Sequence, residues 1–219
     1  MTLDSSDDWA YLDAWRDGDK RAGERLATRY FALLMRFFLN KVRDVDDAAD
    51  LVSETLLGCA SSMANAAGGG SFRSYMFAIA LNKLRGYYRK QAKRRRELED
   101  FADICVAQSL PRSPSSIIAR VEETQLLVNA LRRLSLAQQI VVELNYFENL
   151  SGPEIASLLG VSTGTVYTHL NRGRQRLAAV VTELASDPKL AESTMTGLAT
   201  WAHQVRDKMT PTPAREPAD

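Results

Sequence analysis

The chain has 219 residues, of which 45% are hydrophobic and 25% charged, and its 28 basic residues nearly balance 27 acidic ones. These fractions are ordinary for a globular protein, and they exclude collagen-like, wholly disordered and purely coiled-coil chains. No apolar run approaches the ~20 residues that a bilayer span needs. The segment Met1–Asp8 is polar and acidic, unlike a secretory signal peptide. We therefore expect a cytoplasmic protein with no membrane insertion.

The few cysteines and histidines limit the chemistry available to this chain. Its only cysteines are Cys59 and Cys105, far apart, and its only histidines are His169 and His203. This pattern excludes a disulfide scaffold and provides no zinc spacing. No nucleophile–base pair stands out either, so an enzyme is the least supported class. We expect no catalytic residues, no metal site and no cofactor.

The near-neutral net charge conceals two opposed blocks. Lys83–Arg96 carries eight lysines and arginines without an acid, whereas Asp44–Glu54 carries five acids without a lysine or arginine. A chain that separates its charges in this way can hold two partners of opposite sign.

Every stretch with periodic apolar residues has the spacing of a helix, and no run alternates apolar and polar residues as a strand would. We predict an all-α fold of two small helical domains joined by a flexible linker, the second a helix-turn-helix domain. The predicted boundaries are residues 1–96 for the first domain, 97–115 for the linker, 116–185 for the second domain and 186–219 for a C-terminal extension. Two prolines in Leu110–Pro114 favour an extended linker.

The C-terminal extension divides into two parts. An apolar stripe at helical spacing suggests a helix that docks back on the chain, with a partner-binding helix as the alternative; it comprises Leu198, Trp201, Ala202, Val205 and Met209. The last ~10 residues are rich in proline and poor in large apolar groups, so we expect them to be disordered.

Capping signals define three helices near the C-terminus. Ser135 with Gln138, and Ser151 with Glu154, each fit a capping box. Gly160 can end the second helix in the left-handed conformation, with Val161 following as a buried plug. Ser162 then caps a third helix. A short helix, a glycine turn and a second capped helix form the helix-turn-helix pattern.

The outward face of that third helix carries groups suited to DNA. Thr165, Thr168, His169 and Arg172 fall at i, i+3, i+4 and i+7. Hydroxyl, imidazole and guanidinium groups suit base edges and phosphates in a major groove. The alternative is a plain three-helix unit with a solvated polar face.

A helix of the first domain is predicted to begin at Asp46 or Asp47 and to run to about Ser62. Its exposed side is unusual. Asp47, Asp50 and Glu54 lie on it at i, i+3 and i+7, with Leu57 beside them. A solvated acidic face near a helix start would explain the first aspartates, because negative charge is favourable there. It does not explain Leu57, so we interpret the strip as a protein-docking surface.

A flexible stretch, Ser61–Gly70, precedes a long helix that Ser71 caps and that runs to about Arg96. Four cations form a stripe along it, namely Arg85, Arg89, Lys93 and Arg96, and aromatic side chains are interleaved, namely Tyr75, Phe77, Tyr87 and Tyr88. Aromatic groups beside cations suit single-stranded bases. The alternative is that some of these aromatics belong to the core.

Three motifs in this order resemble the extracytoplasmic-function sigma factors, the minimal two-domain members of the bacterial sigma-70 family. The motifs lie in Asp46–Leu57, Gly70–Asn82 and Leu150–Leu177. The resemblance implies that the chain directs core RNA polymerase to promoters through its β′ clamp helices and β flap. It also implies contact with duplex −35 DNA, with the melted −10 element and with an anti-sigma factor.

The same resemblance assigns roles to individual residues. The polymerase-binding set is Asp47, Asp50, Leu51, Glu54 and Leu57. The −10 set is Phe72, Arg73, Tyr75, Asn82, Lys83, Arg85 and Arg89. The −35 set is Ser162, Thr165, Tyr167, Thr168, His169, Arg172 and Arg174. The segment Ala60–Gly70 resembles the part that captures a flipped base.

Two other functions remain open at this point. A sigma-like decoy would bind an anti-sigma protein without touching DNA, although the basic stripe and the intact helix-turn-helix disfavour it. A dimeric helix-turn-helix regulator would leave the acidic strip and the Phe72–Asn82 motif unexplained.

Overall fold

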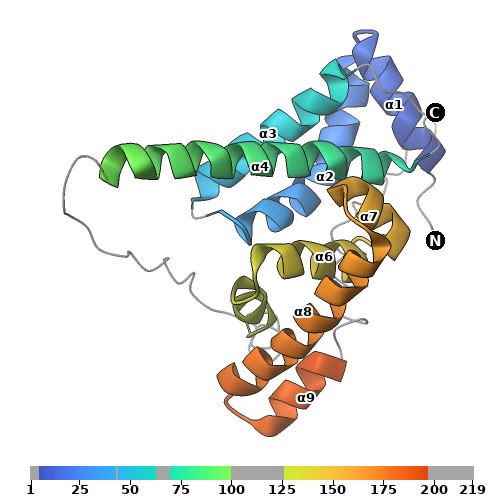
Figure 1. Ribbon diagram of the computed structural model, residues 1–219. Coiled ribbons are helices and arrows are strands. Elements are labelled where there is room, and N and C mark those ends of the chain that lie inside the picture. The colour runs from blue at the N-terminus through green and yellow to red at the C-terminus, as the bar shows by residue number, and fades with distance from the viewer. Residues whose placement is uncertain (1–4, 43, 63–69, 100–125, 197–219) are drawn as a thin grey trace.

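The computed structural model describes residues 5–42, 44–62, 70–99 and 126–196, and within these ranges every regular element is a helix. The N-terminal lobe contains α1 (Ser5–Arg16), α2 (Lys20–Leu39), α3 (Val45–Ser61) and α4 (Phe72–Glu99). The C-terminal lobe contains helical residues 126–132, α6 (Leu136–Tyr146), α7 (Gly152–Leu159), α8 (Thr163–Leu184) and α9 (Pro188–Thr196). Figure 1 shows the long α4 crossing in front of α2, with the C-terminal lobe packed below these two helices. The all-α prediction is confirmed.

Capping aspartates set where the N-terminal helices begin. Asp19 caps α2, and its carboxylate accepts from the backbone N–H groups of Arg21 and Ala22. The prediction that Asp46 or Asp47 caps α3 is wrong: the cap is Asp44, whose extended backbone lets its carboxylate accept from the Asp46 N–H at 3.0 Å. Asp46 and Asp47 instead occupy the first turn, where carboxylates complement the helix dipole.

Aromatic side chains from three helices fill the N-terminal core. Phe37 of α2 meets Phe77 of α4 edge-on, with ring centroids 5.2 Å apart. Phe72 at the start of α4 packs against Trp9 of α1 and Tyr30 of α2. These contacts fix α4 against the first two helices, and Ser71 starts α4 by accepting from the Ser74 N–H.

The helix-turn-helix forms largely as its capping signals predict. Both capping boxes are present, Ser135 with Gln138 and Ser151 with Glu154. Gly160 ends α7 in the left-handed conformation at φ 69°. The predicted burial of Val161 is wrong: its side chain is 40% exposed. The turn at Gly160 carries Val161 outward, and Val166 of α8 supplies the buried contact instead.

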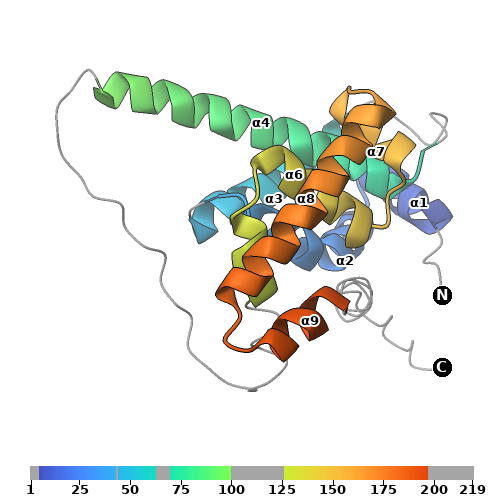
Figure 2. The same ribbon diagram turned by 60° about the horizontal axis from the view of Figure 1, so that its bottom comes forward.

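Within the C-terminal lobe, α8 lies across α6 and α7, and α9 folds back beside its far end (Figure 2). A Cβ on Gly173 of α8 would lie only 2.9 Å from Cγ2 of Val142 on α6. The absence of a side chain at Gly173 therefore permits the close approach of α8 to α6. The predicted linker beyond Glu99 and the apolar stripe Leu198–Met209 lie outside the described residues.

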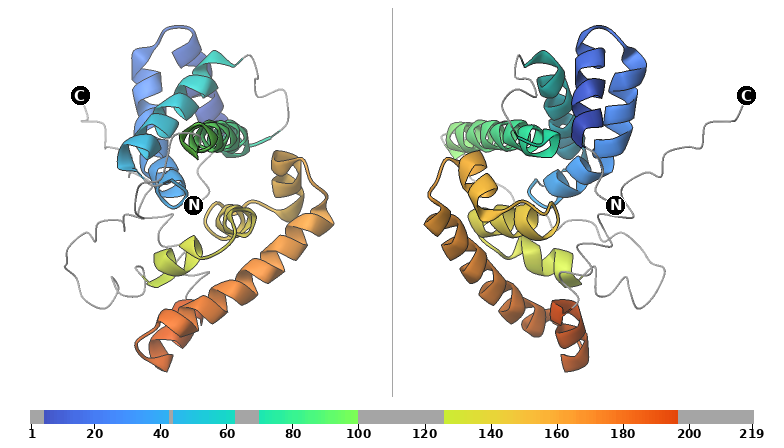
Figure 3. Two further views of the ribbon diagram at one scale, coloured as in Figure 1. Left: turned by 60° about the vertical axis from the view of Figure 1, so that its left-hand side comes forward. Right: turned by 90° about the vertical axis from the view of Figure 1, so that its right-hand side faces the viewer.

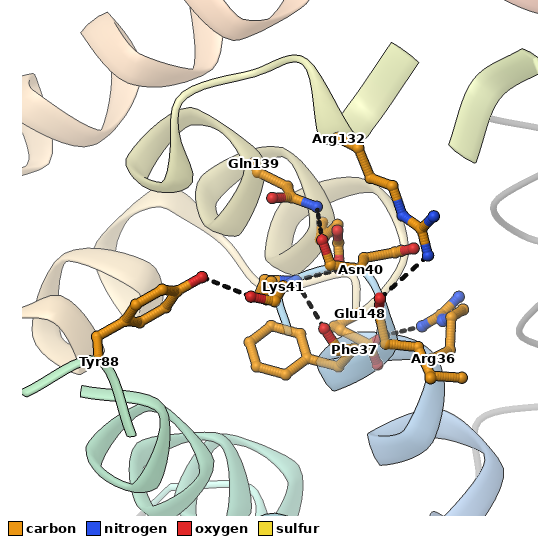
Figure 4. A network of polar contacts seen from close by, with 10 residues as sticks. Arg36, Phe37, Asn40, Lys41, Tyr88, Arg132, Gln139 and Glu148 are labelled. Atoms are coloured by element: carbon orange, nitrogen blue, oxygen red, sulfur yellow. Dashed lines mark hydrogen bonds and ion pairs between the residues drawn. The ribbon is translucent and has the colours of Figure 1, made fainter. Parts of the chain in front are cut away.

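The two lobes pack directly on each other (Figure 3). One continuous hydrophobic cluster joins Phe37, Phe38 and Leu84 of the N-terminal lobe to Ile140 and Leu144 of α6. Polar contacts surround it, and Figure 4 shows those near the end of α2. The Gln139 amide donates to the Asn40 carbonyl at 3.0 Å, and the Arg132 guanidinium donates to the Leu39 carbonyl at 3.1 Å.

Candidate polymerase-docking and nucleic-acid surfaces

The acidic strip, defined as Asp47, Asp50, Glu54 and Leu57, lies along the outer side of α3. Asp50 and Glu54 are exposed, and Leu57 is 62% exposed, which is unusual for a large apolar residue. Leu51, assigned to this surface by the resemblance, is buried instead. It follows Asp50 directly, and one step along a helix turns a side chain by about 100°.

Neighbouring α4 residues hold parts of the acidic strip. The Tyr87 hydroxyl donates to Asp47 Oδ2 at 2.8 Å, and burial together with this carboxylate raises the pKa of the Tyr87 phenol. The Lys83 ammonium lies 3.4 Å from Glu54 Oε2. Lys83 belongs to the −10 set, so the acidic strip and the basic side of α4 adjoin each other.

The −10 set divides into exposed and supporting side chains. Asn82, Arg85 and Arg89 are exposed along α4, in line with a binding surface. Phe72 is buried in the core, where it cannot stack on a base, because α1 covers it through Trp9. Tyr75 is half-buried and donates its hydroxyl to the Cys59 carbonyl at 3.1 Å.

Two arginines of the −10 set contact the C-terminal lobe in this structure. Arg73 lies 3.1 Å from Glu148 Oε2, and the same buried carboxylate pairs with Arg36. Arg85 donates to the Leu159 carbonyl at 3.3 Å and to Asn82 Oδ1 at 3.1 Å. Any use of these guanidinium groups on DNA must therefore replace contacts between the lobes. The side chains of Lys93 and Arg96 lie outside the described ones.

The −35 set gathers at the start of α8. Ser162 caps the helix by accepting from the Thr165 N–H at 3.1 Å, and its hydroxyl lies 2.9 Å from that of Thr165. Thr168, Arg172 and Arg174 are exposed on the following turns. Tyr167 is exposed too, although its ring lies over Gly152, where a Cβ would approach it to 2.8 Å.

His169 points to a different place from the rest of the −35 set. It is half-buried and lines an apolar groove of about 270 Å³ between α4 and the helix-turn-helix. The other lining residues include Leu84, Tyr88, Leu136, Ile140 and Val161. The face that points away from α4 thus consists of threonine, tyrosine and arginine side chains.

Comparison with known proteins shows the family to which this chain belongs. The family description "Sigma-70 region 2" matches residues 26–94, and "Sigma-70, region 4" matches residues 124–177. The sigma factor EcfG of Rhodopseudomonas palustris, named as an ECF RNA polymerase sigma factor, is 32% identical over 148 residues, which cover 68% of this chain and 78% of the relative. The chain belongs to the extracytoplasmic-function sigma factors of the sigma-70 family.

Other sigma factors are also similar to this chain in sequence or in fold. The sigma factor YlaC of Bacillus subtilis is 25% identical over 171 residues, covering 76% of this chain and 96% of the relative. A solved structure of the sigma factor RpoE with the anti-sigma factor NepR, from Bartonella quintana, shares the fold at a TM-score of 0.53 and 23% identity, covering 74% and 98% of the two chains. A structure of CnrH with the cytosolic domain of CnrY gives 0.56 and 22%, covering 82% and 99%.

The region 2 match of this sigma factor begins within α2, so α1 lies outside it. Yet α1 carries a polar cluster that sequence reasoning missed. The Arg16 guanidinium donates to the carbonyls of Cys59, Ala60 and Ser62 at the end of α3. An arginine in an amphipathic helix gives no signal of such partners, because they lie more than 40 positions away.

In the described parts of this sigma factor, no helix combines the length and apolar character that a bilayer span requires. The same residues contain no group of three or more histidine, cysteine or acidic side chains placed to hold a metal ion.

Proposed function

We propose that the acidic strip of this sigma factor contacts the β′ clamp helices of core RNA polymerase, which the chain directs to promoters. Three carboxylates beside one exposed leucine suit a basic partner with an apolar patch, and charge complementarity of this kind favours both specificity and association rate. We assign the second polymerase contact, to the β flap, to the C-terminal lobe.

We propose further that α4 holds the melted −10 strand. Asn82, Lys83, Arg85 and Arg89 follow one another along its exposed side and would bind phosphates and bases, while Tyr75 supports the start of the helix. The end of α3 and the start of α4, on either side of the Ala60–Gly70 segment, would receive a flipped base. Extruding a base costs a few kcal/mol, which a pocket with stacking and hydrogen bonds offsets.

The start of α8 is the proposed −35 reader. Ser162, Thr165, Thr168 and Arg172 present hydroxyl and guanidinium groups to solvent at this end of the helix. Tyr167 and Arg174 are also exposed but lie on another side of α8, beside Gly152 and Tyr146 respectively. Helix-turn-helix proteins contact base edges with this end of the recognition helix. His169, which lines the groove, would contribute only after the C-terminal lobe moves away from α4.

An anti-sigma factor is a further proposed partner. Two solved structures that share this fold are complexes, one of CnrH with the cytosolic domain of CnrY and one of the sigma factor RpoE with the anti-sigma factor NepR. A decoy that never touches DNA is less well supported, because the acidic strip and the exposed α8 face occur in the same chain. The chain would act in the cytoplasm, with the polymerase supplying all catalysis.

The observation that carries this proposal is the acidic strip of α3, with Leu57 exposed among its carboxylates. The experiment is co-purification of the chain with core polymerase, followed by run-off transcription on genomic fragments. We expect defined start sites from the wild type. The variant Asp50→Arg should bind core polymerase at least tenfold more weakly, whereas the matched control Glu24→Arg, on the exposed side of α2, should bind as the wild type does. Absence of complex and of start sites for the wild type would refute the proposal.

A further inference from the structure

Helix α1 contacts both ends of the connection between α3 and α4. At the α3 end, the Arg16 guanidinium donates to the carbonyls of Cys59 at 3.0 Å, Ala60 at 3.3 Å and Ser62 at 2.5 Å. At the α4 end, the Trp9 indole N–H donates to the Gly70 carbonyl at 3.4 Å. One helix therefore sets the distance between the last residues of α3 and the first residues before α4.

Arginine is the side chain best able to make the first contact. The last carbonyls of a helix have no partner within it, and a cation there also complements the negative end of the helix dipole. A guanidinium offers five N–H donors in a planar fork, so one side chain can serve several carbonyls. Asp13 holds one arm of the fork, 3.2 Å from Nη1 of Arg16.

Tyr75 links this cluster to α4. Its hydroxyl donates to the Cys59 carbonyl and accepts from Nη2 of Arg16 at 3.3 Å. Its ring lies against Trp9, with centroids 5.1 Å apart. The contacts of Arg16, Trp9 and Tyr75 thus converge on the place where α3 ends and α4 begins.

The Arg16 contacts are separate from those that hold α1 in the fold. Asp8 pairs with Arg29 and accepts from the Tyr30 hydroxyl at 2.5 Å, and Leu12 is fully buried. Trp15 packs on Gly23, where a Cβ would approach the indole to 2.6 Å. These residues attach α1 to α2, whereas Arg16 contacts the end of α3.

We propose that Arg16 and Trp9 are positioning residues for the capture of a −10 base. They hold Cys59–Ser62 and Gly70, which border the proposed base site, in fixed positions, so α1 takes part in promoter opening although it lies outside the region 2 match. This inference rests on the proposed function, in which this junction receives the base.

The test uses the full chain and the non-template strand of a −10 region mapped by run-off transcription, with 2-aminopurine at the flipped position. Arg16→Met keeps the length of the side chain and removes the donors. We expect at least tenfold weaker strand binding and loss of the 2-aminopurine signal, with duplex −35 binding unchanged. Arg16→Lys should restore part of the affinity, because an ammonium can still donate to one or two carbonyls.

Arg25→Met is the matched control. Arg25 joins α2 to Tyr11 of α1 through an exposed 3.3 Å contact but does not reach the junction, so strand binding should stay within twofold of the wild type. If Arg16→Met and the wild type had equal strand affinity and equal 2-aminopurine signal, this inference would be overturned, while the proposed function would stand. An equal loss in Arg25→Met would also overturn it, since a general charge effect would then suffice.

A second variant keeps the test decisive if Arg16→Met does not fold. Trp9→Phe retains an aromatic ring against Tyr75 and removes the N–H that reaches Gly70. We expect about threefold weaker strand binding, and wild-type affinity and signal for this variant would count against the inference. Failure of the wild type to bind the strand is a different result, and it would overturn the proposed function together with the inference.

Discussion

The Lys41 ammonium lies 2.7 Å from Oε2 of Glu143, although the two residues are 102 positions apart and belong to different lobes. Both side chains are buried. Lys41 also donates to the Phe37 carbonyl at 2.9 Å and lies over the Phe37 ring, 3.8 Å from its centroid. Burial lowers the pKa of Lys41, while Glu143 opposes this shift. The packing of the two lobes therefore depends on the buried Lys41 ammonium keeping its counter-ion, Glu143.

Glu143→Gln should loosen the contact between the lobes. The change leaves the Lys41 ammonium buried without its counter-ion, which typically costs about 3–5 kcal/mol. Small-angle scattering should then show a larger radius of gyration than for the wild type. The double variant Lys41→Met/Glu143→Leu removes both charges and should restore the compact form. A compact Glu143→Gln variant with wild-type stability would contradict this account of the interface.

Glu54→Gln should weaken the binding of core polymerase and strengthen the binding of single-stranded −10 DNA. Glu54 belongs to the acidic strip, so its loss should weaken polymerase binding. The same change frees Lys83, 3.4 Å away, for phosphate contact. Exposed ion pairs contribute about 0.2–1 kcal/mol, so binding of single-stranded −10 DNA should rise by no more than about fivefold. Titrations with core polymerase and with the oligonucleotide check this, and parallel losses in both would show the prediction to be wrong.

Arg172→Ala should weaken binding of duplex −35 DNA by about fivefold or more, because a good guanidinium–base contact contributes about 1–3 kcal/mol of discrimination. Single-stranded −10 binding should be unaffected. Lys189→Ala on α9 is the matched control, as it removes an exposed cation of the same lobe away from the reading face. Fluorescence anisotropy separates the two variants, and identical affinities would remove Arg172 from the −35 surface.

Stability should fall in alkaline solution because of two buried acids. Burial raises the pKa of the Cys59 thiol from its ordinary 9.0 to about 12, and the Arg16 charge opposes this shift. A raised pKa means that the folded state keeps its proton longer, so this stabilisation is complete below pH 9 and is lost between pH 9 and about 12. The expected slope is about 1.4 kcal/mol per pH unit. Burial and the Asp8 carboxylate also raise the pKa of Tyr30, which adds a similar loss above its ordinary 10.0.

Denaturant unfolding at a series of pH values checks this prediction. Cys59→Ala should flatten the dependence between pH 9 and 10 and leave the Tyr30 contribution above pH 10. Tyr30→Phe should leave the slope between pH 9 and 10 unchanged and reduce it above pH 10, where the Cys59 contribution remains. If both variants keep the wild-type pH dependence of the free energy of unfolding, groups other than Cys59 and Tyr30 cause the loss of stability, and the prediction is wrong.

Local signals predicted the helix-turn-helix well. The hydroxyls of Ser135 and Ser151, the acceptors three residues later and the left-handed Gly160 all act within a few positions, so the sequence alone places them. The acidic strip was found in the same way, from helical spacing. Helical spacing also places Leu51 and Phe72 on the buried sides of α3 and α4, as the structure has them, and only the resemblance assigned these two residues to binding surfaces.

Long-range contacts gave no such signal. Lys41 would ordinarily be expected in solvent, and the counter-ion that allows its burial is 102 positions away. Glu148 meets Arg36 and Arg73 from the opposite lobe, and Arg16 meets the end of α3. Each of these contacts depends on how helices pack, which spacing along one helix does not specify.

The most direct test of the central claim is permanganate footprinting of a mapped promoter with core polymerase and the full chain. The account predicts reactive, unpaired thymines around the −10 element only when both proteins are present, and loss of that reactivity with Asp50→Arg. A duplex that stays closed although the wild-type chain and core polymerase form a complex would contradict it.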